Sequence, residues 1–256
     1  MTAIDTLLAA LSSGDVTIVD LTAPLSSQTP VLQLPPPFAN TIALSLEPVS
    51  NFDDDGPFWG WNNIHTGEHT GTHLDAPVHW ASGRQGHSVD TIPPSRLVGP
   101  VLVLDFTAEV EADSDFLLDA SHLDAYVAAN GPLAHDSWLI FRTGWSTRNQ
   151  DATAFLNADD AGPHTPGLSV AGAEWLAASP IAGFGVETVG IDAGQAGGMN
   201  PPFPAHHHLL GADTYGLTQL QNLDQLPASG ALLVVAPLPI VGGTGSPARV
   251  YALVPA

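Results

Sequence analysis

Cysteine and lysine are both missing from this chain of 256 residues, and its lysine and arginine total is only 5. Without cysteine there can be no disulfide, no thiolate ligand and no cysteine nucleophile, so a bound metal would need histidine and carboxylate ligands. The 26 acidic residues give a formal net charge of −21. A chain of this charge would repel phosphate backbones and anionic lipids, so we expect neither a nucleic-acid partner nor a membrane partner.

Long hydrophobic runs are also absent. No apolar stretch reaches the roughly 20 residues of a transmembrane helix, and residues 1–14 lack the basic start and apolar run of a signal peptide. We therefore expect a cytoplasmic protein. Hydrophobic residues still make up 44% of the chain, enough for a substantial core, and no linker divides it. We predict a single domain over residues 1–256.

Apolar periodicity predicts a helix within residues 1–14, where hydrophobic side chains recur at helical spacing before Gly14. Runs rich in β-forming residues predict strands at 16–21, 101–106, 137–141, 184–192, 232–240 and 250–254. Because such runs outnumber the helical patterns, we expect a mixed α/β fold dominated by sheet.

The densest chemical signal is the stretch 65–80 (HTGEHTGTHLDAPVHW), which holds four of the 11 histidines. Within it, His69, His73, Asp75 and His79 offer three imidazoles and one carboxylate. This combination of donors is a plausible ligand set for a divalent transition metal. An ion held by two neutral imidazoles and one carboxylate keeps open coordination positions and can activate a water molecule.

The same stretch is unlike the helical zinc motif in which two histidines lie four residues apart. Gly71 and Pro77 disfavour a helix here. An extended segment fits better, because it places His73 and Asp75 on the same side of the chain.

Four aromatic residues flank this motif and predict a hydrophobic wall for a flat, apolar substrate. Phe38 lies in the proline-rich segment 28–40, Trp59 and Trp61 precede the motif, and Trp80 follows it. The alternative is that these side chains pack against the core.

The stretch 69–79 resembles the motif of the metal-dependent cyclase superfamily, which includes bacterial kynurenine formamidases, isatin hydrolases and some lactone hydrolases. Other segments match in the family's order over roughly residues 16–254: 20–22 (DLT), 142–145 (RTGW), 166–169 (PGLS), 190–192 (GID) and 222–227 (NLDQLP). The resemblance implies a swivelling β/β/α fold and a homodimer or homotetramer.

The resemblance also implies roles for single residues. It implies metal ligands at His69, His73 and Asp75. His79 would be the catalytic acid/base, and His206 matches a later histidine of the family. Together with Gln219, His206 would hold a second water, orient the substrate carbonyl or relay a proton.

One departure from the family pattern bears on the number of metal ions. Formamidase-type members carry a glutamate that helps to bind a second metal, and Thr218 occupies that position here. A neutral hydroxyl is a poor substitute for that carboxylate. We therefore expect one divalent metal per chain. The sequences around Asp192 and Tyr215 resemble the isatin hydrolase branch, which uses one Mn²⁺. A set of two histidines and one carboxylate accepts Mn²⁺, Zn²⁺ or Fe²⁺, and we expect Mn²⁺ first and Zn²⁺ next.

These features predict a metal-dependent hydrolase that opens a cyclic amide in a small aromatic substrate. A serine hydrolase is disfavoured because residues 243–247 (GTGSP) do not form a Gly-x-Ser-x-Gly elbow. An aryl formamidase or a lactone hydrolase is the alternative within the same class. The alternatives of another class are a non-hydrolytic cyclase or dehydratase and a metal-binding protein without catalytic activity.

Overall fold

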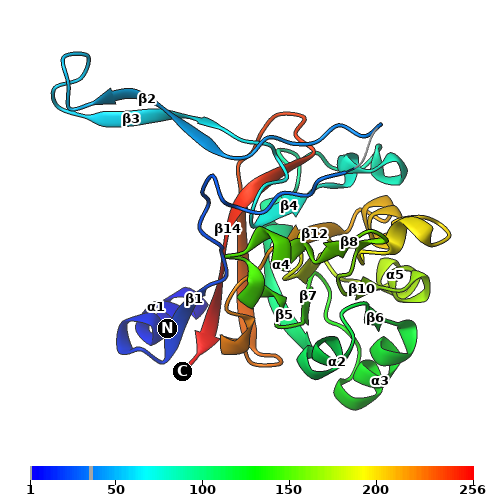
Figure 1. Ribbon diagram of the computed structural model, residues 1–256. Coiled ribbons are helices and arrows are strands. Elements are labelled where there is room, and N and C mark those ends of the chain that lie inside the picture. The colour runs from blue at the N-terminus through cyan, green and yellow to red at the C-terminus, as the bar shows by residue number, and fades with distance from the viewer. Residues whose placement is uncertain (1, 35–36) are drawn as a thin grey trace.

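A single large sheet forms the centre of the molecule (Figure 1). The computed structural model describes residues 2–34 and 37–256, so Met1 and residues 35 and 36 of the proline-rich segment lie outside the described residues. The eight strands, in sheet order, are β1 (Val16–Asp20), β14 (Gly245–Pro255), β13 (Ala231–Pro237), β5 (Val98–Asp105), β7 (Trp138–Arg142), β11 (Gly183–Val186), β12 (Tyr215–Thr218) and β4 (His73–Asp75).

The sheet closes on itself through its longest strand. The first residues of β14 pair with β4, and the rest of β14 pairs with β13 and β1. All strands except β1 therefore form a barrel-like ring. Strands β5, β7, β11 and β12 are parallel neighbours, and the other pairings in the ring are antiparallel. The expected mixed, sheet-rich α/β fold is confirmed.

Helices lie mainly on the outer face of the parallel strands (Figure 1). The α-helices are α1 (Ala3–Ser13), α2 (Thr107–Ala112), α3 (Ala120–Asn130), α4 (Ala152–Leu156) and α5 (Val170–Ala177). Short 3-10 or π-helical turns are η1 (Pro77–His79), η2 (Ala81–Gly83), η3 (Pro94–Leu97), η4 (Trp145–Arg148), η5 (Ala196–Gly198), η6 (His206–Leu210) and η7 (Leu223–Gln225). Among the described residues, none of these helices has the length and apolar character needed to cross a membrane.

Side chains point alternately to the two faces of the strands and so contribute to two separate hydrophobic cores. On β7, Trp138 and Ile140 point into the ring, while Leu139 and Phe141 point outward and pack beneath the helices. This alternation is the geometric consequence of the two-residue period of a strand. Since both faces are covered, the parallel strands consist almost entirely of apolar residues.

The strand that we predicted at 184–192 is shorter in the structure. β11 ends at Val186, and the next side chain, Glu187, is buried. Its carboxylate accepts hydrogen bonds from the backbone N–H groups of Thr143, at 2.5 Å, and Gly144, at 2.6 Å. These bonds hold the chain at the end of β7, so the ladder does not continue to residue 192.

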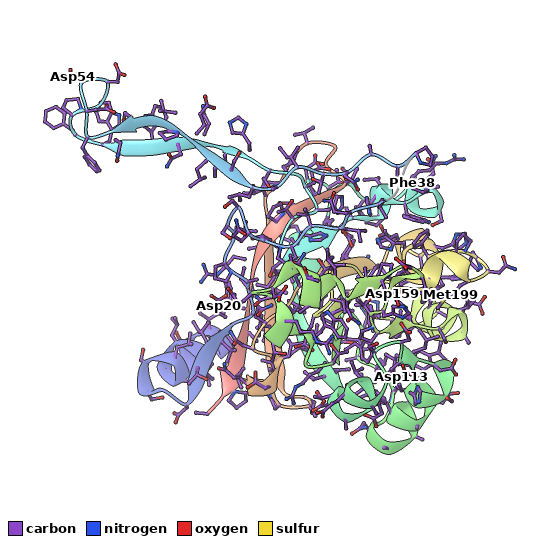
Figure 2. All side chains as sticks on the ribbon, in the orientation of Figure 1. Asp20, Phe38, Asp54, Asp113, Asp159 and Met199 are labelled. Atoms are coloured by element: carbon purple, nitrogen blue, oxygen red, sulfur yellow. The ribbon has the colours of Figure 1, made fainter. Side chains whose placement is uncertain are left out.

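Three two-stranded sheets complete the fold: β2 (Ser45–Asn51) with β3 (Gly60–His65), β6 (Leu117–Leu118) with β10 (Gly167–Leu168), and β8 (Ala158–Asp159) with β9 (Gly162–Pro163). The first is a hairpin that projects from the body, and we call residues 45–65 the arm (Figure 1). Figure 2 shows Asp54 at its tip. Nearly all of its residues are exposed, including Trp61 with 59% exposure.

We predict that Gly183→Ala will destabilise the protein by about 1–3 kcal/mol, the usual effect of overpacking a core. A Cβ at Gly183 would lie 2.3 Å from Cζ3 of Trp138, whose ring is fully buried. Gly190→Ala is the matched control, because its Cβ would meet nothing within 4 Å, and we expect a change within about 0.5 kcal/mol. Urea denaturation measures both free energies of unfolding. Equal values for the two variants would contradict the close packing at Trp138.

Candidate metal centre

The histidine motif folds as a short strand followed by a turn. β4 is inserted between β12 and β14, with Leu74 buried in the ring core and His73 and Asp75 on its other side. After β4, Ala76 is extended, as expected before a proline, and Pro77 begins the turn η1. The extended conformation that we predicted for the histidine motif does not continue to His79. His79 ends η1, and this turn brings its ring back over His69.

Three imidazoles converge on the carboxylate of Asp75, which is 1% exposed. The nitrogen-to-oxygen distances are 2.7 Å from His69 Nδ1, 3.2 Å from His73 Nε2 and 3.9 Å from His206 Nε2. His206 comes from η6, more than 120 residues further along the chain. Burial alone would raise the pKa of Asp75, but the imidazoles of His73 and His69 outweigh it and hold this pKa well below its usual range. Asp75 is therefore a buried carboxylate anion.

Each of these imidazoles donates its other ring N–H to a fixed acceptor. His73 Nδ1 donates to the Gly71 carbonyl at 2.7 Å, His69 Nε2 to the Thr244 hydroxyl at 2.9 Å, and His206 Nδ1 to Asp192 at 2.5 Å. A neutral imidazole with one protonated nitrogen has a lone pair on the other, and these partners assign the tautomers. In the neutral form of each imidazole, the lone pair therefore faces Asp75. A divalent cation suits this position, because it would replace the protons that these nitrogens otherwise share with Asp75.

The predicted ligands and a second possible set share two residues. His69, Asp75 and His79 each offer one ligand atom, and these atoms lie within 4.8 Å of one another. This set contains His79 where we predicted His73. His73 nevertheless reaches the same carboxylate oxygen as His69. The structure thus brings all four motif residues together, and either His73 or His79 can supply the third ligand.

His79 joins the cluster by stacking on its neighbours. Its ring centroid is 3.9 Å from that of His69 and 5.4 Å from that of His206. Burial lowers the pKa of His79 to about 3; the imidazoles of His69, His206 and His73 add to this shift, and Asp75 opposes it. His79 is consequently neutral at physiological pH, with a lone pair on one ring nitrogen.

His206 has the opposite tendency. Burial by itself would lower the pKa of His206, but the hydrogen bond to Asp192 and the charge of that carboxylate outweigh it, so the pKa is raised. The side chain of Asp192 also accepts a hydrogen bond from the backbone N–H of Ala205 at 2.7 Å. Asp192 therefore holds both the start of η6 and the imidazole that η6 carries.

Trp80 is the predicted substrate-contacting residue that the structure places at this cluster. Its ring centroid lies 4.8 Å from that of His206 and 5.7 Å from that of Phe203. Our sequence reasoning missed Phe203. The available signal was its position three residues before His206.

The other three aromatic residues predicted to contact the substrate, Phe38, Trp59 and Trp61, are exposed on the arm or on the surface of the body. Trp59 and Trp61 belong to the arm and are 52% and 59% exposed, so they neither seal the core nor reach the histidine cluster. Phe38 is 60% exposed. Figure 2 shows it on the body, far from Asp54 at the tip of the arm.

Gln219 and Thr218 are both buried at the end of β12. The side chain of Gln219 donates to the carbonyl of Pro30 at 3.2 Å, so it holds the proline-rich segment. Its backbone carbonyl accepts from the hydroxyl of Thr72 at 2.7 Å. Thr218 places its hydroxyl 2.9 Å from Nδ1 of His73. It thus lies behind a predicted ligand, where it limits the rotation of the ring.

Comparison with known proteins identifies the fold and the family. The model of the cyclase family, described as a putative cyclase, matches residues 19–193. Isatin hydrolase of Roseibium aggregatum is 49% identical over 250 residues, covering 96% of this chain and 95% of that protein. Kynurenine formamidase of Salinibacter ruber is 30% identical over 184 residues, covering 71% of this chain and 74% of that protein.

A solved structure agrees with these matches. The crystal structure of an isatin hydrolase bound to the product analogue thioisatinate has a TM-score of 0.96 and 48% sequence identity, with 100% of both chains covered. The fold is the expected swivelling β/β/α fold of the metal-dependent cyclase superfamily, the class of protein that the histidine motif suggested. The chain belongs to the cyclase family.

We predict that His79→Gln will flatten the dependence of stability on pH in the metal-free protein. Folding lowers the pKa of His79 from 6.5 to about 3, so below pH 6.5 the unfolded state takes up a proton that the folded state does not. The contribution of His79 to the free energy of unfolding is therefore complete above pH 6.5 and is lost as the pH falls toward 3. Urea denaturation between pH 7.5 and about 4.5, above most carboxylate pKa values, measures the slope.

His135→Gln is the control for this measurement, because the side chain of His135 is 81% exposed. We expect the slope of this variant to equal that of the original protein. If His79→Gln also keeps the original slope, the lowered pKa of His79 is wrong.

Proposed function

We propose that the chain is a metal-dependent hydrolase that opens a cyclic amide in a small aromatic substrate, as isatin hydrolases do. The observation that carries this proposal is the convergence of three imidazoles with fixed tautomers on the buried carboxylate of Asp75. The 49% identity to an isatin hydrolase over 96% of the chain supports the substrate class.

One divalent ion per chain, preferably Mn²⁺ and next Zn²⁺, would be held by His69, His73 and Asp75. His73 is the better third ligand, because its Nδ1 is engaged by Gly71 and its Nε2 is therefore directed at Asp75. The resemblance aligns Thr218 with the glutamate that helps formamidase-type members to bind a second metal, and the hydroxyl of Thr218 contacts His73. This contact supports a single ion.

In the proposed reaction, an ion held by His69, His73 and Asp75 would supply Lewis-acid chemistry to a water molecule and to the amide carbonyl. His79, neutral at physiological pH, takes a proton from the attacking water. As the carbon–nitrogen bond breaks, His79 returns this proton to the leaving nitrogen. The products are an amine and a carboxylic acid, and the acid then loses the second water proton to solvent as it ionises. Proton transfer by a positioned side chain contributes about 10²–10⁴-fold to the rate.

The remaining site residues orient the substrate. His206, fixed by Asp192, directs Nε2 toward the same space and orients the substrate carbonyl or a second water. Trp80 packs against the aromatic ring of the substrate, next to Phe203. Gln219 acts at a distance, by holding Pro30 and the proline-rich segment that leads to Phe38.

Aryl formamide hydrolysis is the second candidate reaction. It is favoured by the 30% identity to kynurenine formamidase, which is weaker support than the match to isatin hydrolase. A turnover screen of isatin, lactones and aryl formamides, with Mn²⁺ and Zn²⁺ supplied in turn, distinguishes the candidates. If an aryl formamide is turned over fastest, aryl formamides replace cyclic amides as the proposed substrate class.

We predict that His79→Gln will lower the turnover of isatin by about 10²–10⁴-fold while retaining one equivalent of metal. Elemental analysis measures the metal content, and initial rates measure the turnover. His135→Gln, with its exposed imidazole, is the control and should keep full activity. Full activity of His79→Gln would contradict its catalytic role.

Metal removal tests the proposal independently of His79. A chelator should abolish turnover in the original protein, and Mn²⁺ should restore it. Unchanged activity after complete removal of the metal would rule out the mechanism, and two tightly held equivalents per chain would contradict the single-ion site.

We also propose that residues 1–256 act as one cytoplasmic domain that assembles into a homodimer or homotetramer through the arm. A two-stranded hairpin alone in water is only marginally stable. The arm nevertheless exposes large apolar side chains, with Phe58 at 84% and Ile64 at 67% exposure. Contact with a second copy would cover them, and would place Trp59 and Trp61 against the neighbouring subunit.

We predict that the double variant Trp59→Ser, Trp61→Ser will have a lower assembled mass in analytical ultracentrifugation than the original protein. The matched control is Ile4→Ser, Leu8→Ser, which removes two apolar side chains from α1 that are similarly exposed, at 65% and 57%. An unchanged mass in the arm variant would show that the arm does not hold the assembly together.

A further inference from the structure

A chain of hydrogen bonds lies behind His69, on the side away from Asp75. His69 Nε2 is 2.9 Å from the hydroxyl oxygen of Thr244. That hydroxyl lies 2.5 Å from Oε2 of Glu68, and the same oxygen accepts the backbone N–H of Thr244 at 3.2 Å. Glu68 precedes His69 in sequence, whereas Thr244 immediately precedes β14 and is 175 residues from His69.

Counting protons fixes the direction of this chain. A carboxylate only accepts hydrogen bonds, so the single hydroxyl proton of Thr244 is donated to Glu68. The hydroxyl oxygen can then only accept from the ring of His69. His69 must therefore be protonated on Nε2, so in the neutral ring the lone pair is on Nδ1, the nitrogen that lies 2.7 Å from Asp75. The carboxylate of Glu68 thus selects the tautomer of His69 through the hydroxyl.

The backbone of β14 fixes the ring in the same orientation. A Cβ at Gly245 would lie 2.5 Å from Cε1 of His69 and 2.6 Å from the carbonyl oxygen of Leu74. The ring therefore lies directly against the chain at this glycine. The neighbouring residue, Thr244, provides the acceptor at the far edge of the ring.

We infer that Glu68 is a positioning residue that acts through Thr244 to present Nδ1 of His69 to a divalent transition metal. The inference rests on the proposed metal-dependent function and adds a specific device to it. His73 is held by a backbone carbonyl and His206 directly by a carboxylate, whereas His69 is held through an intervening hydroxyl. Partners of this kind fix the orientation of a ligand and raise its basicity, and their loss typically lowers metal affinity by about 10–100-fold.

A purely structural role for Glu68 makes different predictions. Since Glu68 also accepts the N–H of Thr244, it could simply attach the start of β14 to the histidine motif. Thr244→Val keeps this backbone bond but removes the hydroxyl, whereas Thr244→Ser keeps both. The positioning role requires that valine impairs metal binding and that serine preserves it. A structural role predicts no difference between the two.

Calorimetric titration of the metal-free protein with MnCl₂, and separately with ZnCl₂, measures the affinity. We expect Glu68→Ala and Thr244→Val each to bind about 10–100-fold more weakly. The double variant should be no weaker than either single variant, because both residues act in one chain. Glu47→Ala is the matched control: it also removes a carboxylate hydrogen-bonded to an imidazole, at 2.8 Å from His65 on the arm, and should bind as the original protein does.

The tautomer of His69 provides a second readout, independent of activity. Long-range ¹H–¹⁵N NMR spectra of the metal-free protein should show the Nε2–H form in the original protein and in Thr244→Ser, and a mixture of tautomers in Thr244→Val. If Glu68→Ala fails to fold, the valine and serine variants still decide the question.

The outcomes separate this inference from the function on which it rests. Original metal affinity in both Glu68→Ala and Thr244→Val, with normal turnover of the original protein, would overturn the positioning role and leave the hydrolase proposal intact. Failure of the original protein to bind Mn²⁺ or Zn²⁺ would overturn both.

Discussion

The structure of the site depends on the buried carboxylate of Asp75 and the unprotonated nitrogens that face it. A buried carboxylate is costly unless opposite charge or hydrogen-bond donors compensate for it. Here the nearest groups are His69 Nδ1 and His73 Nε2, and their neutral rings present lone pairs to Asp75, because the other ring nitrogens already donate. The buried carboxylate therefore needs positive charge beside it, either as protons on these nitrogens or as a divalent cation in their place. The ring of strands makes this possible by holding β4 on both sides.

Much of this site could be predicted from the sequence, because its signal is local. His69, His73, Asp75 and His79 lie within one short stretch, and the two-residue period of a strand correctly places His73 and Asp75 on one side. The strand-rich α/β fold was equally predictable, since the apolar runs of the parallel strands are buried on both faces.

The parts that could not be predicted depend on contacts between distant segments. Thr244 has no motif of its own, and its role follows only from the pairing of β14 with β4. The aromatic residues of the arm precede the motif in sequence, but the hairpin carries them away from the body (Figure 1). Gln219 has a side chain that can serve many roles, and only its bond to Pro30 defines one. A local pattern identifies residue types, whereas tertiary pairing decides what they face.

The position of β14 at the end of the chain has a consequence for biosynthesis. The histidine motif leaves the ribosome early, but its hydroxyl partner Thr244 lies 175 residues after His69. Until Gly245–Pro255 has emerged, β4 lacks one of its two neighbours, and the end of the ring is open. The nascent chain would therefore carry its histidines as a flexible, weak chelator. The complete surroundings of the proposed ion therefore form only after the last strand of the chain has been synthesised.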